Sequence, residues 1–377
     1  MKLIIEPDDG VAPLLAAIRS AKKSVEIAIF RFDRKDIETA LTMAAAAKGI
    51  GVEAIIAFAN RGGEANLRKL ELRFLDAGIV VARSADDLVR YHGKYILIDR
   101  RVLHVLSFNF TNTDIDHSRG FGLTTTNASW VREAVRLFKA DSTRTRYTPK
   151  VDTFVVSPVN SRSVLAAFLR RAKTQLLIYD PKIADQEMRR ILHARAKAGV
   201  EIKVIGSVAG HVPFEVQKLS GIRLHTRTII RDRRQAFVGS QSLRTAELDA
   251  RREVGLIVRD APIVKKLIAT FESDWTSASA KHASPKEADV RAAEPESAPE
   301  KTVAATQKAV RVFAKELDPL ALSVKKAVRK AVAKAGQDVL EDKDVKVTMK
   351  KVVKKAMKDA VNEAVKEAQV ANSETDA

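Results

Sequence analysis

The sequence contains no cysteine, and this absence excludes disulfide bonds, thiolate metal sites and cysteine nucleophiles. It also contains no apolar run long enough to cross a bilayer. Acidic side chains appear within the first nine residues, and no apolar segment of a secretory signal follows them. We therefore expect a cytoplasmic protein without a transmembrane segment, whose contact with an anionic membrane, if it makes one, is peripheral.

Positive charge is the strongest global property of the sequence. The 377 residues include 66 Lys and Arg against 47 Asp and Glu, a net charge of +19. Residues 276–377 contribute 20 basic and 16 acidic side chains, so residues 1–275 carry a net charge of +15. A strongly basic globular region favours polyanionic partners: nucleic acid, an anionic membrane surface or a phosphate-bearing substrate.

The composition changes near residue 276. Residues 276–300 are rich in Ala, Ser, Glu and Pro, which is typical of a disordered linker. Residues 301–377 form a basic tract rich in Ala, Val and Lys, where apolar residues recur at three- and four-residue spacing between Met349 and Val365. This spacing predicts an amphipathic helical tail. Such a helix would dock onto DNA, a membrane or a partner, or pack on itself or on the rest of the protein.

Residues 1–275 contain an internal repeat. A helix-like segment precedes an apolar, strand-like segment at residues 14–30 and again at residues 164–179, and in both copies a second helix and another strand follow. Helices that alternate with short strands predict an α/β fold with a largely parallel sheet. We expect two α/β halves, residues 1–145 and 146–275, that form an internal pseudo-dimer within a monomer.

Each half carries the same short motif, His-x-(Lys/Arg)-x4-Asp. The first copy is His92-x-Lys94-x4-Asp99, and the second is His225-x-Arg227-x4-Asp232. A serine stands fifteen residues after each histidine, and a second polar residue stands two positions further on. These four positions are Ser107, Asn109, Ser240 and Ser242. Two copies with equal spacing are a specific signal, because the chain has only 7 histidines.

The spacing of the motif predicts a phosphate pocket. Residues two apart on a strand face the same way, so each histidine shares a face with its Lys or Arg. We expect Asp99 and Asp232 to be structural residues of tight turns. The strand after each turn then brings the serines and Asn109 beside the histidine. Duplication across a two-fold axis surrounds one pocket with two imidazoles and two cations, which would neutralise the oxygens of a phosphate group.

With these motifs the sequence resembles the phospholipase D superfamily, whose signature His-x-Lys-x4-Asp-x6-Gly-Ser-x-Asn occurs in duplicate. The resemblance covers residues 1–275. It implies that one histidine attacks phosphorus to form a phosphohistidine, and that the other protonates the leaving group and then activates water or an alcohol. It implies no metal ion and no other cofactor. Carried over by position, His92 is the nucleophile, His225 is the general acid and base, and Lys94 and Arg227 bind phosphate. Ser107, Asn109, Ser240 and Ser242 would support the bound substrate.

The sequence departs from the superfamily signature at several positions. Arg227 replaces the second lysine, Leu106 the first glycine and Ser242 the second asparagine. The superfamily also tends to place a carboxylate downstream of each histidine, and in two-domain members this carboxylate reaches the histidine of the opposite half. Glu253 stands 28 residues after His225, whereas Gly120 stands 28 residues after His92. We therefore expect Glu253 to orient His92, and His225 to lack a carboxylate unless Asp114 or Asp116 replaces it.

These features predict a metal-independent phosphodiesterase that acts on a phospholipid head group, by hydrolysis or by transfer to another alcohol. One alternative is a nuclease or DNA-end-processing enzyme, which the basic charge of residues 1–275 supports. Another is a non-catalytic scaffold that binds nucleic acid in the cleft and uses the tail as a tether. A decayed repeat that keeps its shape without its chemistry also fits the motifs.

Overall fold

The computed structural model describes residues 1–58, 64–85 and 88–282, all of which belong to one structural unit. The helical tail expected at residues 301–377, and the linker from residue 283 to residue 300, lie outside the described residues. Within the described ranges, no helix is both long and apolar enough to span a bilayer.

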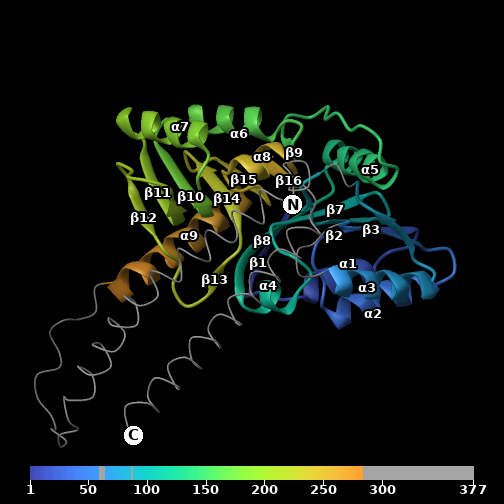
Figure 1. Ribbon diagram of the computed structural model, residues 1–377. Helices are drawn as coiled ribbons and strands as arrows, with labels where there is room; N and C mark the ends of the chain where they lie inside the picture. The colour runs from blue at the N-terminus through green and yellow to red at the C-terminus, as the bar shows by residue number, and fades with distance from the viewer. Residues whose placement is uncertain (59–63, 86–87, 283–377) are drawn as a thin grey trace, which may run out of the picture. The chain divides into compact units, whose positions relative to one another are not determined.

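The two expected halves are present as two sheets, each accompanied by helices (Figure 1). In chain order, the elements of the first half are β1 (Lys2–Glu6), α1 (Ala12–Arg19), β2 (Ser24–Ile29), α2 (Lys35–Ala46), β3 (Gly51–Ile56), α3 (Glu64–Asp76), β4 (Val80–Arg83), β5 (Arg90–Tyr91), β6 (Tyr95–Ile98), β7 (Val102–Leu106), α4 (Asn112–Asp116), β8 (Ser118–Thr125) and α5 (Ala128–Ser142). Those of the second half are β9 (Phe154–Ser157), α6 (Ser161–Arg170), β10 (Gln175–Ile183), α7 (Gln186–Lys197), β11 (Glu201–Val208), β12 (Glu215–Gln217), β13 (Arg223–Leu224), β14 (Arg227–Arg231), β15 (Gln235–Gly239), α8 (Thr245–Asp249), β16 (Arg251–Val258) and α9 (Ala261–His282).

Both sheets are mixed, so the expectation of a largely parallel sheet is wrong. The first sheet has the order β1-β8-β7-β6-β2-β3-β4, and the second has the order β12-β11-β10-β14-β15-β16-β5. Within a half, the strands joined by a helical crossover, such as β2 with β3 and β10 with β11, pair in parallel, and so do β11 and β12, which no helix separates. The motif strands β6 and β7, and likewise β14 and β15, are joined by tight turns, and such turns force neighbouring strands to run in opposite directions.

Asp99 and Asp232 lie at these tight turns. Asp99 and Arg100 both have positive φ, as do Asp232 and Arg233, which is the geometry of the two central residues of a type I′ turn. The carboxylate of Asp99 accepts hydrogen bonds from the backbone N–H groups of residues 22, 23 and 24, and Asp232 accepts the equivalent bonds from residues 173, 174 and 175. Each aspartate therefore ties its hairpin to the start of the neighbouring central strand.

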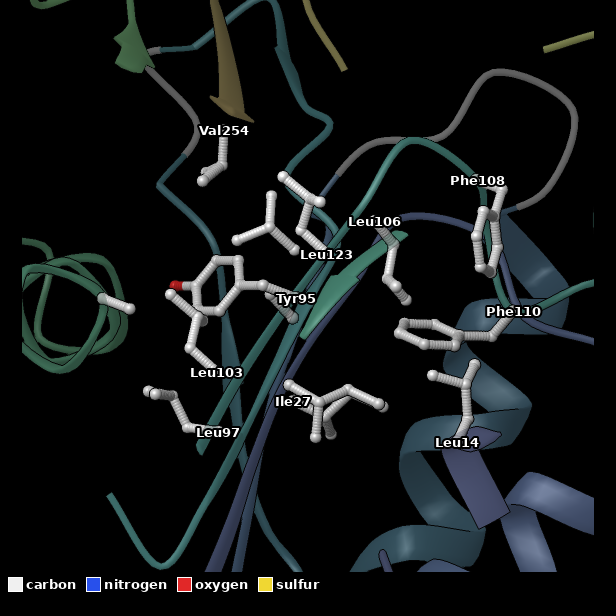
Figure 2. Packing of buried hydrophobic residues seen from close by; sticks show 14 of the residues in the cluster. Leu14, Ile27, Tyr95, Leu97, Leu103, Leu106, Phe108, Phe110, Leu123 and Val254 are labelled. Atoms are coloured by element: carbon white, nitrogen blue, oxygen red, sulfur yellow. The ribbon is translucent and has the colours of Figure 1, made fainter. Parts of the chain in front are cut away.

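The hydrophobic core follows the alternation of side chains along these strands. Figure 2 shows Tyr95, Leu97 and Leu103 on one side of the first sheet, and Leu106 and Phe110 on the other side with Leu14 of α1. All six side chains are fully buried. Burial of each aliphatic side chain contributes about 1.5–3 kcal/mol, so the motif strands are rigid supports for the polar side chains at their ends.

Helix α9 joins the two halves. Its Asp274 accepts hydrogen bonds from Arg119 of β8 (Nε, 2.9 Å) and from the Tyr179 hydroxyl of β10 (2.7 Å). The helix extends to His282, so residues 276–282 are helical where a disordered linker was expected. This stretch contains Ala and Lys, which favour helix continuation. The remaining domain boundaries stay predictions.

Candidate active site

Each motif histidine is held by a strand of the opposite half. β5 pairs in parallel with β16, and the His92 N–H that follows β5 donates to the Arg252 carbonyl at 2.7 Å. In the same way β13 pairs with β8, and the His225 N–H donates to the Arg119 carbonyl at 3.1 Å. This reciprocal exchange brings both motifs to one seam. The charges of Lys94 from the first motif and Arg227 from the second both act on His92, so the two motifs share one site.

His92 contacts a carboxylate of the opposite half. Its Nδ1 lies 2.7 Å from Glu253 Oε2, which is the contact that the resemblance to the superfamily implies. Lys94 Nζ lies 2.8 Å from the same Nδ1 and donates to the His92 carbonyl at 2.7 Å. All three side chains are buried. The second ring nitrogen, Nε2, makes neither of these contacts.

Burial sets the ionisation of this group. It lowers the pKa of His92 well below its usual range, and the Lys94 ammonium adds to the effect. It also raises the pKa of the Glu253 carboxyl to about 7, although Lys94 opposes the shift. Burial likewise lowers the pKa of Lys94 well below its usual range. His92 is therefore a neutral imidazole at neutral pH, with a lone pair available for nucleophilic attack.

The second histidine contacts a carboxylate from a different position. Asp114 Oδ2 lies 3.4 Å from His225 Nε2, whereas Asp116 pairs with Arg34 at 2.6 Å. Asp114 also accepts hydrogen bonds from the Asn109 side-chain amide (2.6 Å) and from Arg223 (2.5 Å). Of the two candidate replacements for a carboxylate at position 120, the structure thus places Asp114 beside His225.

Asp114 and His225 are both buried, and burial affects the ionisation of the two side chains differently. Burial and the Arg227 guanidinium lower the pKa of His225 well below its usual range, while Asp114 opposes this shift. For Asp114, burial acts to raise the pKa, but the Asn109 backbone N–H and Arg223 help to hold it below the usual value. Asp114 is therefore ionised beside a neutral His225 in the free protein.

Arg227 takes the position that Lys94 has in the first copy. Its Nη1 donates to the His225 carbonyl at 2.5 Å, just as Lys94 Nζ donates to the His92 carbonyl. Although Arg227 replaces the lysine of the signature, its positive charge therefore binds the carbonyl of the motif histidine in the same way as that of Lys94. The guanidinium has further N–H groups with which it can bind an oxyanion.

All four predicted substrate supports make side-chain hydrogen bonds within the fold, including the one from the Asn109 amide to Asp114. The Ser107 hydroxyl accepts from the Phe121 N–H (2.9 Å), and the Ser240 hydroxyl accepts from the Val254 N–H (3.2 Å), so both hold the strand beside them. The Ser242 hydroxyl donates to Asp180, a buried carboxylate that ends an apolar run of β10. Asn109 differs, because its side-chain oxygen is buried and has no hydrogen-bond partner in the described residues. Substrate contact by these residues stays a prediction.

Four arginines outside the motifs surround the two histidines. Arg251 adds to the positive charge at His92, and Arg223 adds to that at His225. Arg90 and Arg31 both lie over the Phe30 ring, at 5.2 and 5.4 Å, and this ring contacts His92 edge-on at 4.6 Å. Sequence reasoning missed these residues. The signal available was that Arg90 and Arg223 each stand two residues before a motif histidine.

Within the described ranges, no group of three or more His, Asp or Glu side chains is arranged to hold a metal ion. The charged groups that act on the two imidazoles are those of Lys94, Arg227, Arg251, Arg223 and the two carboxylates. Such a site can bind an oxyanion between cations and present a neutral imidazole to it.

Comparison with known proteins agrees with this geometry. The family model described as "Cardiolipin synthase, PLD-like domain" matches residues 14–142 and 165–275. No curated protein matches the sequence significantly. Among solved structures, polyphosphate kinase from Porphyromonas gingivalis superposes with a TM-score of 0.61 at 22% identity, over 73% of this chain and 50% of that one. Phosphatidylserine synthase from Haemophilus influenzae superposes with a TM-score of 0.54 at 11% identity, over 84% of this chain and 94% of that one.

These structural similarities establish the fold, and this chain spans only half the length of the polyphosphate kinase. The family model covers both halves and includes both motif histidines with their cations. The chain therefore belongs to the PLD-like domain family.

Proposed function

We propose that this protein is a phosphodiesterase that transfers a phosphoryl group through a covalent adduct on His92. The observation that carries the proposal is the contact of His92 Nδ1 with Glu253 from the opposite half, at 2.7 Å. A carboxylate on Nδ1 fixes the orientation of the ring and stabilises the positive charge that develops when Nε2 attacks. The proposal does not require a metal ion, because Lys94 and Arg227 supply the positive charge.

Binding of substrate would free His92 for attack. In the free protein, Lys94 Nζ and Glu253 compete for the same ring nitrogen, which can form only one in-plane hydrogen bond. A phosphodiester anion gives the Lys94 ammonium a better partner. Nδ1–H is then left to Glu253, and the lone pair of Nε2 attacks phosphorus.

His225 would serve the leaving group. As the Nε2–P bond forms, the P–O bond to the leaving group breaks, and His225 donates a proton to the departing oxygen. This step requires a protonated His225. The bound anion allows His225 to be protonated, because it offsets the Arg227 and Lys94 charges that help to lower the pKa of His225 in the free site. The neutral His225 then accepts a proton from water, or from an alcohol, as that oxygen attacks phosphorus and releases His92.

Two substrate classes fit this chemistry. A phospholipid head group is our first candidate, and the description of the matched family as cardiolipin synthase supports it. Nucleic acid is the second candidate. The four arginines around the histidines and the net charge of +15 on residues 1–275 favour a substrate with several adjacent phosphates.

The first test is hydrolysis of bis(p-nitrophenyl) phosphate by the full chain in the presence of EDTA, with His92→Ala as the control. Release of p-nitrophenol by the wild type alone supports the proposal, whereas loss of turnover with EDTA and recovery with a divalent ion contradicts it. Phospholipid vesicles and plasmid DNA are then compared as substrates. Turnover of vesicles supports the lipid, and cleavage of DNA that falls steeply with salt supports the nuclease.

A further inference from the structure

A second cavity, of about 540 Å³, lies near the seam and is lined by none of the motif residues. Its walls include Tyr91 and Arg252, which are the chain neighbours of His92 and Glu253. Tyr91 and Arg252 are partners in the β5–β16 pairing. Because successive side chains of a strand point to opposite faces, the cavity lies behind the strand pair that carries His92 and Glu253.

Arginine side chains supply the charge of this cavity. Arg144 and Arg146 both line it, both are exposed, and neither makes a hydrogen bond or ion pair with any other described residue. Arg252 is buried and pairs with Asp141 at 3.1 Å, and its Nε has no hydrogen-bond partner among the described residues. Asp141 is the acidic residue of the described lining. Among the described residues of the lining, the pairing of Asp141 with Arg252 leaves an excess of two positive charges, those of Arg144 and Arg146.

The backbone at Arg144 gives a second, independent observation. Arg144 follows the last turn of α5 with a φ of 57°, and the Thr145 N–H donates to the Ala140 carbonyl at 2.8 Å. This is the helix-ending motif that favours glycine at the left-handed position, since a Cβ there is sterically disfavoured. Here the position holds an arginine whose side chain is not used by the described fold. An arginine at this disfavoured position is explained if its guanidinium binds something that enters the cavity.

The rest of the lining indicates what kind of molecule this is. Tyr91 and Tyr147 present aromatic rings and are almost fully buried, and Leu88 and Val159 add aliphatic surface. Thr145 and Thr148 provide hydroxyl groups. Guanidinium groups bind phosphate oxygens through pairs of N–H donors, and a cavity of this volume is in the range that holds a small organic molecule.

We propose that this cavity binds a small organic phosphate, with the phosphate between Arg144 and Arg146 and the apolar part against Tyr91 and Tyr147. The site is distinct from the phosphodiester site, because it lies on the opposite face of the β5–β16 pair. It does not depend on the proposed function, since binding can be measured without turnover.

Isothermal titration of the full chain with phenyl phosphate tests the proposal, and phenol serves as the uncharged comparison. We expect phenyl phosphate to bind, and the variant Arg144→Gln/Arg146→Gln to bind at least tenfold more weakly. The matched control Arg132→Gln/Lys139→Gln removes the same charge from exposed positions of α5 outside the cavity and should bind like the wild type. Lys94→Met, which alters the phosphodiester site, should retain the binding at the cavity.

A second variant separates loss of binding from loss of folding. Arg144→Gly places glycine at the left-handed position, so we expect its Tm to rise by about 2 °C while its affinity for phenyl phosphate falls. Weaker binding together with higher stability cannot result from misfolding. Wild-type affinity in the Arg144→Gln/Arg146→Gln variant, complete loss of binding in Lys94→Met, equal binding of phenol, or no binding by the wild type at 10 mM would each overturn the proposal.

Discussion

The ring of Phe108 fills the space beside Gly120, where the superfamily places its first carboxylate. A Cβ atom at position 120 would lie 2.8 Å from Phe108 Cδ1, closer than unstrained atoms approach. The equivalent positions of the second copy are Gln241 and Glu253, sixteen and 28 residues after His225. The first copy therefore has a large apolar residue where the second has space for a carboxylate, and Asp114 approaches His225 from α4 instead.

The close approach of Phe108 to Gly120 predicts that the cost in stability of substituting Gly120 depends on whether Phe108 is present. Gly120→Ala should lower the free energy of unfolding by about 1–3 kcal/mol, because the fully buried ring of Phe108 must shift to admit the new Cβ atom. In a Phe108→Ala background the same change should cost clearly less, since the ring atoms are gone and only the Cβ of residue 108, 3.2 Å away, remains. Chemical denaturation of the four proteins of this double-mutant cycle measures the difference. Equal costs of Gly120→Ala in both backgrounds would contradict the account.

The side chains that meet within each motif could be predicted from the sequence. The parity of a strand and the tight turn at an aspartate are local properties, so they place Lys94 beside His92 without knowledge of the rest of the fold. The contact between His92 and Glu253 joins residues 161 positions apart. It could be predicted only because the motif is duplicated and resembles a known family.

Other features of the site depend on packing that the sequence does not reveal. Asp114 and Asp116 are two apart on a short helix, so they point roughly 200° apart, but the sequence does not tell which of them faces His225. β5 and β13 have two residues each, too few for a detectable periodicity, so the exchange of strands between the halves was not predicted. The pairing of these strands is what brings Arg90 and Arg223 to the site.

The pH dependence of turnover should follow the ionisation of the Glu253 carboxyl group. Because burial raises the pKa of this carboxyl to about 7, it is protonated at pH 5 and ionised at pH 8. If the carboxylate orients His92, kcat/KM should fall as the pH drops through about 7. Glu253→Gln should be slower by roughly a hundredfold and should lack this acidic limb. Glu272→Gln, at an exposed glutamate paired with Arg233, is the control and should keep the wild-type profile. A limb that persists in Glu253→Gln would assign the ionisation to another group.

Substitution of His92 and substitution of His225 should impair different steps of the reaction. His92→Ala cannot form the covalent adduct and should be inactive on every substrate. His225→Ala should still form it from bis(p-nitrophenyl) phosphate, because p-nitrophenolate leaves without a general acid, whose contribution is otherwise about 10²- to 10⁴-fold. Rapid mixing should therefore show a burst of p-nitrophenol in His225→Ala but not in His92→Ala. A burst only in His92→Ala would exchange the two roles, and full activity of both variants would favour a non-catalytic protein.

Asp114 should affect the general acid and leave the nucleophile unchanged. Its carboxylate raises the pKa of His225 against the effect of burial, so Asp114→Asn should lower that pKa further and reduce the fraction of protonated His225. We expect slower cleavage, by about tenfold or more, of a diester whose alkoxide leaving group needs a proton. Cleavage of bis(p-nitrophenyl) phosphate should change little.

Asp116→Asn is the matched control for this experiment. It removes a carboxylate of the same helix that pairs with Arg34 and does not contact His225. Both substrates should therefore be cleaved at the wild-type rate by Asp116→Asn. The ratio of the two rates, measured for each variant, cancels differences in the amount of folded enzyme. If Asp114→Asn slows both substrates equally, Asp114 does not act through the leaving group, and its role is to hold Asn109 and Arg223 in place.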